Sequence, residues 1–345
     1  MAWEKTGNIA RWLHSLPDAR SIVIIGDSVS EGQGSVTSVQ NRWGNKLSDA
    51  LRAKRGLPAG NIGWIPASTS ALDQSLPYSF TTMQRGSSMT TAFTATGLPG
   101  AMKFGTPADQ AWIGVDQALP AMTVHLYEPS GGSTYANAPG GGSFTTSTAP
   151  TAGRYGRYRV PAGGGNLYLN LSAGTSYLLG MDGRIDDALV VHTIARSGAT
   201  ITDWNAWLAG TGGAQSALRV LTALAPDLVL VQLGGNDIFG GSSSPDETSW
   251  RSRLTTLKAT LDGLPTKPAI RYVVTPLPAK LLGGMASYWQ QYIDVASQIL
   301  GGLLDARSVP NQDAQPSWYH SDGVHLGDRA ASEIATVIAS QINPA

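Results

Sequence analysis

Near both ends of the chain, uninterrupted hydrophobic runs alternate with segments whose apolar residues recur at helical spacing. The runs at residues 22–25 and 228–233 are apolar apart from one glutamine, as expected of strands buried on both faces of a parallel sheet. Less regular runs predict two further strands at residues 188–194 and 270–274. Strands that alternate with helices predict a mostly parallel sheet covered by helices on both faces.

Apolar residues at spacings of three and four predict the helices between and after these strands. The helix around Leu257 has the clearest pattern. Residues 244–247 before it have the spacing of a capping box, with Pro245 at the first helical position. Gly56 ends the first helix. The predicted helices cover residues 41–55, 218–224, 245–264, 288–303 and 330–342.

The middle of the chain has almost no helical period. Short strand-like runs recur there between clusters of glycine, proline and serine, which predicts an antiparallel sandwich or barrel-like module. Two glycine-rich stretches, at residues 130–143 and 161–165, are interpreted as its hairpin loops. Because this block interrupts the alternation of helices and strands, we expect a discontinuous α/β domain at residues 1–64 and 186–345, with an inserted β-rich domain at residues 85–185. The predicted strands lie at residues 89–95, 111–115, 122–128, 143–148, 155–160, 167–171 and 177–181.

The composition excludes several classes of partner and site. Lysine plus arginine equals aspartate plus glutamate at 24 each, and this zero net charge argues against binding to nucleic acid or to an anionic membrane surface. The chain has no cysteine, which excludes disulfides, a cysteine nucleophile and thiolate metal sites. No signal peptide precedes the first strand, and no run approaches the roughly 18–20 apolar residues of a membrane span. We therefore expect a soluble protein whose compartment the sequence leaves open: cytoplasmic, associated with a virion such as a phage, or exported by a route that its own N-terminus does not direct.

Polar residues cluster where the predicted strands end and where the last helix begins. The carboxyl ends of parallel strands lie at one edge of a sheet, and strands two and three flank strand one in the order 2-1-3-4-5, so we expect the first three clusters to meet there. The start of the last helix can overhang the same edge. The clusters comprise residues 26–28, 197–198, 235–237 and 322–325.

Each cluster contributes a residue suited to nucleophilic catalysis. The hydroxyl of Ser28 needs a base to remove its proton, and the imidazole of His325 is the natural base at neutral pH. Asp322 is placed to accept the other ring N–H of His325 and to hold its tautomer. The backbone N–H groups of Ser28 and Gly198 and the side-chain amide of Asn236 are donors for a tetrahedral oxyanion. Each such donor is typically worth about 3–4 kcal/mol of the barrier.

These clusters resemble the sequence blocks of the SGNH (GDSL-type) serine esterase/lipase family, named for its Ser, Gly, Asn and His. Residues 26–28 read GDS, like the first block, and residues 234–237 read GGND, which matches G-x-N-D of the third. Residues 322–325 read DGVH, which matches D-x-x-H of the fifth block, and Gly198 stands where the second block has its glycine. Val29 replaces the family's usual leucine, which is a conservative change.

The resemblance covers about residues 20–62 and 186–342 and implies a flavodoxin-like, three-layer α/β/α SGNH-hydrolase fold with a parallel sheet in the order 2-1-3-4-5. The β-rich middle is then an inserted antiparallel β-sandwich or jelly-roll-like domain. We expect no cofactor and no metal. By similarity, the catalytic residues are Ser28, Asp322 and His325, and the oxyanion hole is formed by Ser28, Gly198 and Asn236.

Two further interpretations concern residues near these clusters. His320 and His325 together suggest a metal site, but the chain offers no thiolates and His325 has a better use as a base. Trp204, Trp318 and Tyr319 are candidates for an aromatic platform that binds a sugar ring or an acyl chain. The alternative for these aromatic residues is packing.

The sequence thus predicts a metal-independent serine esterase that works through an acyl-enzyme intermediate. Its expected substrate is an O-acetyl or other short acyl ester, on a carbohydrate such as a cell-envelope polysaccharide or on a small molecule. A lipase or thioesterase for longer acyl chains is the alternative within enzymes. A third reading is a non-catalytic glycan-binding or phage-tail-like structural protein on a hydrolase scaffold, against which the complete catalytic set argues. The inserted domain is expected to bind carbohydrate, or else to mediate oligomer contacts or docking.

Overall fold

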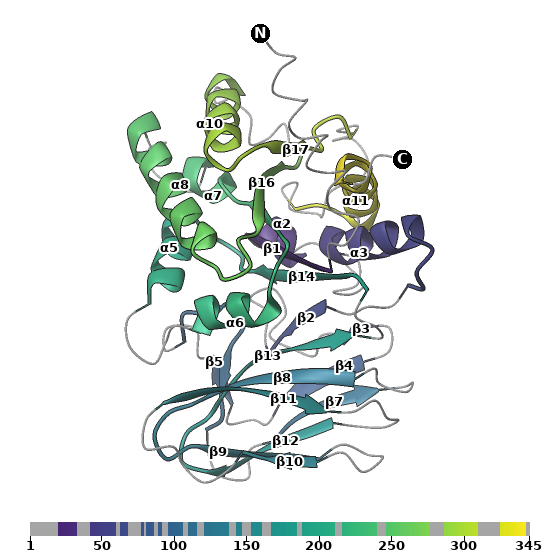
Figure 1. Cartoon of the computed structure of the whole chain (residues 1–345), viewed down its shortest axis with the longest axis vertical. Helices are drawn as coiled ribbons and strands as arrows, with labels where there is room; N and C mark the ends of the chain where they lie inside the picture. The colour runs from purple at the N-terminus through teal and green to yellow at the C-terminus, as the bar shows by residue number, and fades with distance from the viewer. Residues whose placement is uncertain are drawn as a thin grey trace.

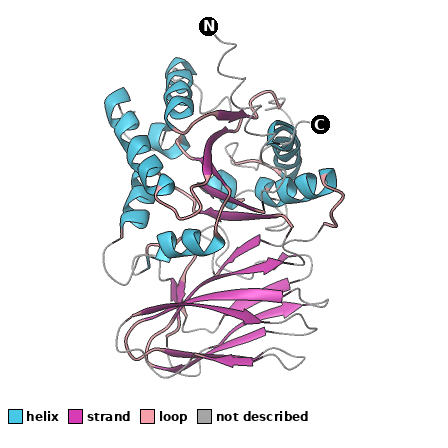
Figure 2. Cartoon of the chain, viewed as in Figure 1, coloured by secondary structure: helices cyan, strands magenta, loops and turns pink. Residues whose placement is uncertain are grey.

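Within the part of the chain that the structure describes, the strands form three β-sheets, one of five strands and two of six (Figure 1). In Figure 2, helices surround the five-stranded sheet, whereas the two six-stranded sheets form a part made almost entirely of strands. The computed structural model describes residues 20–32, 42–59, 63–67, 77–78, 81–85, 89–91, 96–105, 110–115, 121–137, 143–146, 153–160, 167–184, 188–210, 216–239, 246–276, 286–309 and 325–342.

The five-stranded sheet is parallel throughout and has the order β14-β1-β15-β16-β17. Numbered along the α/β part of the chain, this is the predicted order 2-1-3-4-5, which is confirmed. The central strand β1 pairs with β14 on one side and with β15 on the other, and its residues are all buried. The strands are β1 (Ser21–Gly26), β14 (Val190–Ala195), β15 (Leu228–Gln232), β16 (Ala269–Val274) and β17 (Leu303–Asp305).

Helices cover both faces of this sheet, as predicted for a three-layer α/β/α fold. Alternate residues of β1 point to opposite faces, so that Ile22 and Ile24 pack with α3 and α11 while Val23 and Ile25 pack with α5, α6, α8 and α10 (Figure 1). The helices are α2 (Ser28–Glu31), α3 (Trp43–Lys54), α5 (Ile201–Ala209), α6 (Ser216–Leu224), α7 (Gly235–Phe239), α8 (Glu247–Asp262), α10 (Ala286–Ile299) and α11 (Asp328–Ile342).

Two predicted helix boundaries are wrong. The N-cap of α8 is Asp246, whose side chain accepts the backbone N–H of Ser249, so the helix begins after the proline that was predicted to lie in its first turn. The helix predicted to reach Leu303 ends at Ile299, because Gly301 follows with a φ of 81°, in the left-handed region. Leu303 instead begins β17.

The two six-stranded sheets pack face to face. Both are antiparallel, with the orders β10-β9-β12-β7-β4-β3 and β11-β8-β13-β6-β5, and β2 pairs with β13. One hydrophobic cluster fills the space between them, with Val124 and Met181 from one sheet and Ala136 and Leu169 from the other. The strands are β2 (Gly63–Pro66), β3 (Pro77–Tyr78), β4 (Thr81–Arg85), β5 (Thr90–Thr91), β6 (Met102–Lys103), β7 (Gln110–Val115), β8 (Ala121–Glu128), β9 (Ser133–Asn137), β10 (Ser143–Thr145), β11 (Arg154–Val160), β12 (Leu167–Ala173) and β13 (Tyr177–Arg184).

The stretch at residues 130–143, predicted as a loop, contains strand β9. Its residues Thr134 and Ala136 are buried, and the strand pairs with β10 and β12. The glycines on both sides of this short alternating run are typical of loops, which is why a loop was predicted here. Strands β2 and β3 lie before residue 85 and β4 ends at it, and all three also belong to the two antiparallel sheets.

The β-rich part packs directly against the α/β part. Trp64, Leu98 and Leu179 share a hydrophobic cluster with Ile25 of β1 and with residues of α5 and α6. A buried polar network lies in the β-rich part and is centred on His125 of β8. The imidazole of His125 packs edge-on against the indole of Trp64, with 5.0 Å between the ring centroids. No helix among the described ranges is long and apolar enough to cross a membrane.

Candidate active site

Ser28 is placed by the junction of β1 and α2. It is the first residue of α2, directly after Asp27, and it is 8% exposed. Asp27 is the N-cap: its Oδ1 accepts the backbone N–H of Val29 over 2.9 Å. The helix ends at Gly32, whose φ of 84° is left-handed. Ser28 is therefore held on a short, capped turn at the carboxyl end of the central strand.

Gly198 lies in a tight turn after the neighbouring strand β14. The N–H of Ala199 donates to the carbonyl of Arg196 over 3.1 Å and closes the turn, and Gly198 stands at its third position with a φ of 78°. This is the position at which a type II turn needs a positive φ, and glycine adopts it without strain. The N–H of Arg196 also donates to the carbonyl of Gly26 over 3.3 Å, which joins this loop to the end of β1. Among the described residues, no atom lies within 4 Å of a Cβ built on Gly198, so no described neighbour opposes a side chain there.

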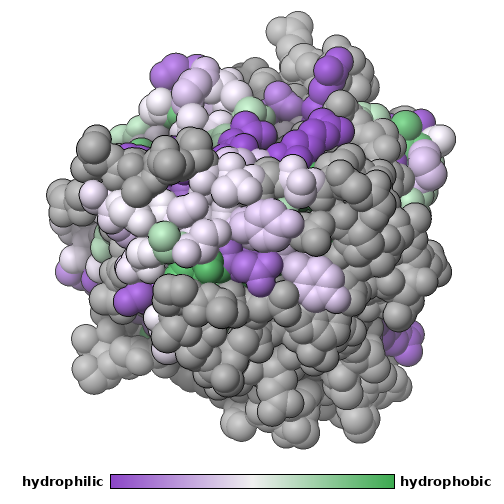
Figure 3. All heavy atoms as spheres, turned by 90° about the horizontal axis from the view of Figure 1, so that it is seen from below, coloured by the Kyte–Doolittle hydropathy of each residue, from purple (hydrophilic) through white to green (hydrophobic). Residues whose placement is uncertain are grey.

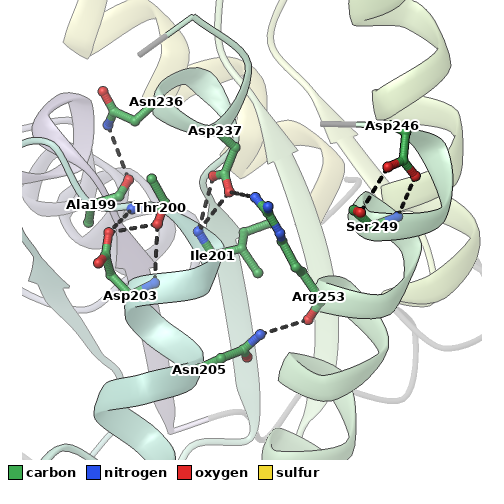
Figure 4. Close-up of polar contacts among 10 residues, drawn as sticks. All are labelled: Ala199, Thr200, Ile201, Asp203, Asn205, Asn236, Asp237, Asp246, Ser249 and Arg253. Carbon is green, nitrogen blue, oxygen red and sulfur yellow. Dashed lines mark hydrogen bonds and ion pairs between the residues drawn. The ribbon is translucent and has the colours of Figure 1, made fainter. Parts of the chain in front are cut away.

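Asn236 lies on α7, directly after β15, and contacts the same turn. Its Nδ2 donates to the carbonyl of Ala199 over 3.1 Å (Figure 4). A primary amide has two N–H donors, and this contact occupies one of them. Gly198 and Asn236 are thus brought together through Ala199, from two strands that flank β1.

Asp237, the next residue of α7, fixes the start of α5. Its carboxylate accepts the N–H of Ile201, with Oδ2 at 3.0 Å, and lies 3.4 Å from Nη1 of Arg253 (Figure 4). Burial raises the pKa of Asp237 to about 6, although the N–H of Ile201 and Arg253 both act to lower it. This carboxylate has no predicted role, and its G-x-N-D position is the signal that points to one.

A series of buried side-chain hydrogen bonds leads to Asp27 and supports its carboxylate. Trp43 donates to Oγ of Ser30 over 3.2 Å, and Ser30 donates to Oε1 of Gln232 over 2.6 Å. Gln232 in turn hydrogen-bonds to Asp27. Burial still raises the pKa of Asp27 to about 7, and the charge of Asp237 adds to this rise.

Glu31, at the end of α2, reaches across to the turn that contains Gly198. Its Oε2 accepts the backbone N–H of Ser197 over 2.6 Å, and its side chain is buried, at 6% exposure. No sequence motif points to Glu31. A contact between positions so far apart in the chain leaves no local pattern.

Trp204 lies under the site rather than on its surface. It is 0% exposed, its ring centroid is 5.2 Å from that of Trp207, and its indole N–H donates to the carbonyl of Gly26 over 3.2 Å. The structure therefore gives Trp204 a packing role that supports the end of β1. Trp318 and Tyr319 lie outside the described residues.

His325 lies just before α11 and is partly buried. Its neighbour Leu326 belongs to the hydrophobic cluster of α3 and α11, against which Val29, the neighbour of Ser28, also packs. Asp322 and His320 lie outside the described residues. Within the described ranges, no group of three or more His, Cys, Asp or Glu residues could hold a metal ion.

Comparison with known proteins shows what this fold is similar to. No protein-family model and no curated protein matches the chain. Among solved structures, a peptidoglycan O-acetylesterase superposes with a TM-score of 0.66, over 98% of this chain and 95% of that chain, at 14% identity. The two proteins share a fold. This likeness, together with the sheet order, confirms the fold that the sequence blocks implied.

Two carbohydrate esterases of family two are also similar, but over less of the chain. The one from Clostridium thermocellum has a TM-score of 0.35 and 13% identity, over 75% of this chain and 97% of that one. The one from Corynascus thermopiles, solved with a carbohydrate binding domain, has a TM-score of 0.37 and 13% identity, over 75% and 98%. These TM-scores are too low to establish that the whole chains share a fold.

Proposed function

We propose that the protein is a serine esterase that removes O-acyl groups from a carbohydrate through an acyl-enzyme intermediate. The Oγ of Ser28 attacks the ester carbonyl while His325, held by Asp322, takes its proton and then passes it to the departing sugar hydroxyl. Water then attacks the acyl-enzyme, with His325 as base, and releases the carboxylic acid. The N–H groups of Ser28 and Gly198 and the amide of Asn236 stabilise the oxyanion in both steps.

One observation carries this proposal: Ser28, Gly198 and Asn236 come from three adjacent parallel strands and are tied together at one sheet edge. The carbonyl of Gly26 links the turn of Gly198 to β1, and the carbonyl of Ala199 links it to Asn236. The carboxyl edge beside the central strand is where ligands bind in open α/β sheets. The placement of His325 before α11 agrees with a base that reaches this edge from the next layer.

The substrate we propose is an O-acetyl or short acyl ester of a polysaccharide, such as one of the cell envelope. The similar solved structure is named for the hydrolysis of O-acetyl esters on peptidoglycan, which supports this choice. A lipase or thioesterase for longer chains is the alternative, and the dependence of rate on chain length distinguishes the two.

The test is hydrolysis of p-nitrophenyl acetate, butyrate and octanoate by the wild type and by Ser28→Ala, each with and without a chelator. We expect acetate hydrolysis that survives the chelator and is lost in Ser28→Ala. A rate that rises with chain length would favour the lipase. A wild type no faster than Ser28→Ala on these esters and on an O-acetylated polysaccharide would contradict the proposal.

We also propose that the β-rich part binds the polysaccharide, through the outer face of the sheet that contains β9 and β12. Tyr135 is 37% exposed and pairs with Asn170, and Tyr168 lies two residues before Asn170 on the same face of β12, so two tyrosines and an amide share this face. Such positions offer stacking and hydrogen bonds to a neutral sugar. Figure 3 views the molecule from the end where β9 and β10 lie, and the described residues there are mainly weakly polar.

Co-sedimentation with insoluble peptidoglycan tests this second proposal in the full chain. Replacement of Tyr135 and Tyr168 by alanine should weaken binding several-fold while p-nitrophenyl acetate hydrolysis stays unchanged. Equal binding by the wild type and the double variant would contradict it.

A further inference from the structure

Glu31 and Ser28 lie on the same turn of α2, three residues apart, and Glu31 points to the loop after β14. Its buried carboxylate accepts the N–H of Ser197 over 2.6 Å. A short bond from a backbone N–H to a carboxylate is stronger than one between neutral groups, and at a buried position it is little weakened by solvent. This bond fixes the loop relative to Ser28 itself.

The residues on both sides of Gly198 are anchored, each from a different element. On one side, Ser197 is held by Glu31 of α2. On the other, the carbonyl of Ala199 is held by Asn236 of α7. The N–H of Gly198 therefore lies between two fixed points, one on the helix of Ser28 and one on the helix of Asn236.

The direction of this N–H depends on the type of the turn. Types I and II differ mainly by rotation of the central peptide, which here carries the carbonyl of Ser197 and the N–H of Gly198. The φ of 78° at Gly198 is that of type II. The bond from Glu31 to the N–H of Ser197 fixes where this turn lies relative to Ser28.

We propose that Glu31 is a positioning residue that holds the turn in the place, relative to Ser28, at which the Gly198 N–H faces the oxyanion. This inference rests on the proposed esterase function of Ser28. Removal of one oxyanion donor typically costs about 100- to 1000-fold in kcat. Partial loss of its alignment should cost less, about 10- to 100-fold, and should leave KM nearly unchanged, because the donor acts on the transition state.

The test compares Glu31→Ala with Glu31→Gln, because glutamine keeps a side-chain oxygen that can accept from Ser197. We expect kcat on p-nitrophenyl acetate to fall about 10- to 100-fold in Glu31→Ala and to stay within about threefold of wild type in Glu31→Gln, with KM within twofold in both. Asp246→Ala, which removes the N-cap of the distant α8, controls for loss of stability and should leave kcat unchanged.

A second readout does not depend on activity. In the ¹H–¹⁵N spectrum of the full chain, the amide resonance of Gly198 should shift or broaden in Glu31→Ala and stay near its wild-type position in Glu31→Gln. An unshifted Gly198 resonance in Glu31→Ala overturns the proposal even if the wild type proves inactive, which would itself reject the esterase. Equal losses of kcat in the two variants would also overturn it, because they would assign the effect to the charge.

Discussion

Asp27 is hydrogen-bonded by the side chain of Gln232, yet it keeps a pKa of about 7 because it is buried. The carboxylate caps α2 and so lies beside the proposed nucleophile Ser28. The native protein therefore holds a proton on Asp27 at pH values where the unfolded chain, with an aspartate pKa near 3.8, has released it. This difference in bound protons links the folding stability to the pH.

Asp27→Asn should remove this dependence. Because the native state binds more protons than the unfolded chain between about pH 4 and pH 7, the contribution of Asp27 to stability is lost as the pH rises through that window. Asparagine does not titrate and is an equally good N-cap. Between pH 4 and pH 8, the free energy of unfolding of the variant minus that of the wild type should therefore rise by up to about 4 kcal/mol.

Urea unfolding at pH 4, 5, 6, 7 and 8 measures this difference. Asp294→Asn, which removes an exposed carboxylate from α10, is the matched control and should follow the wild type. Parallel stability curves for Asp27→Asn and the wild type would show that Asp27 does not titrate in this range.

Gly198→Ala should cost activity far more than stability. The φ of 78° strains any residue with a Cβ by about 1–2 kcal/mol, whereas the methyl group itself meets none of the described atoms within 4 Å. Alanine favours the alternative turn with a negative φ, which turns the N–H away from the oxyanion. We expect kcat to fall at least 100-fold.

Gly56→Ala is the control for this substitution, since Gly56 has a φ of 66°, follows α3 and likewise has no described atom within 4 Å of a built Cβ. The melting temperature should fall by a similar amount in both variants, and only Gly198→Ala should lose activity. Comparable activity in the two variants would argue against a role for Gly198 in the oxyanion hole.

The strands of the α/β part could be predicted because they are buried on both faces, as the run at residues 22–25 shows. The short strand β17 could not, because its first residue, Leu303, continues the apolar spacing of α10 and only the glycines between them separate the two elements. Ser28, Gly198 and Asn236 could be placed at one edge because each follows a strand. The support that Glu31 gives this edge depends on a tertiary contact that no local pattern encodes.

Asn236→Asp tests the side-chain donor of the oxyanion hole. The replacement keeps the shape but exchanges a donor for a carboxylate, which repels the developing oxyanion and also opposes the carbonyl of Ala199. We expect kcat on p-nitrophenyl acetate to fall about 100- to 1000-fold or more. Asn205→Asp is the control, because Nδ2 of Asn205 also donates to a backbone carbonyl, that of Arg253, at 3.0 Å (Figure 4). If both variants lose the same activity, the loss at Asn236 is structural.

The network of His125 should stabilise the β-rich part without any direct role in hydrolysis. Its Nδ1 lies 2.6 Å from the hydroxyl of Tyr155, and its Nε2 lies 2.8 Å from Oδ2 of Asp182. Burial raises the pKa of Tyr155 well above its usual range, so the tyrosine stays protonated and donates to Nδ1. The ring then donates from Nε2 to Asp182, and both ring nitrogens are satisfied.

His125→Phe keeps a ring in the core but leaves Asp182, which is 1% exposed, without its histidine. We expect a loss of about 3–5 kcal/mol in the free energy of unfolding, as for other buried pairs that lose one partner. The double variant His125→Phe with Asp182→Leu should recover part of this loss, because it removes both polar groups together. Urea unfolding followed by tryptophan fluorescence measures both, since the indole of Trp64 lies against His125. A double variant that loses the sum of the two single losses would mean that the groups do not act as a pair.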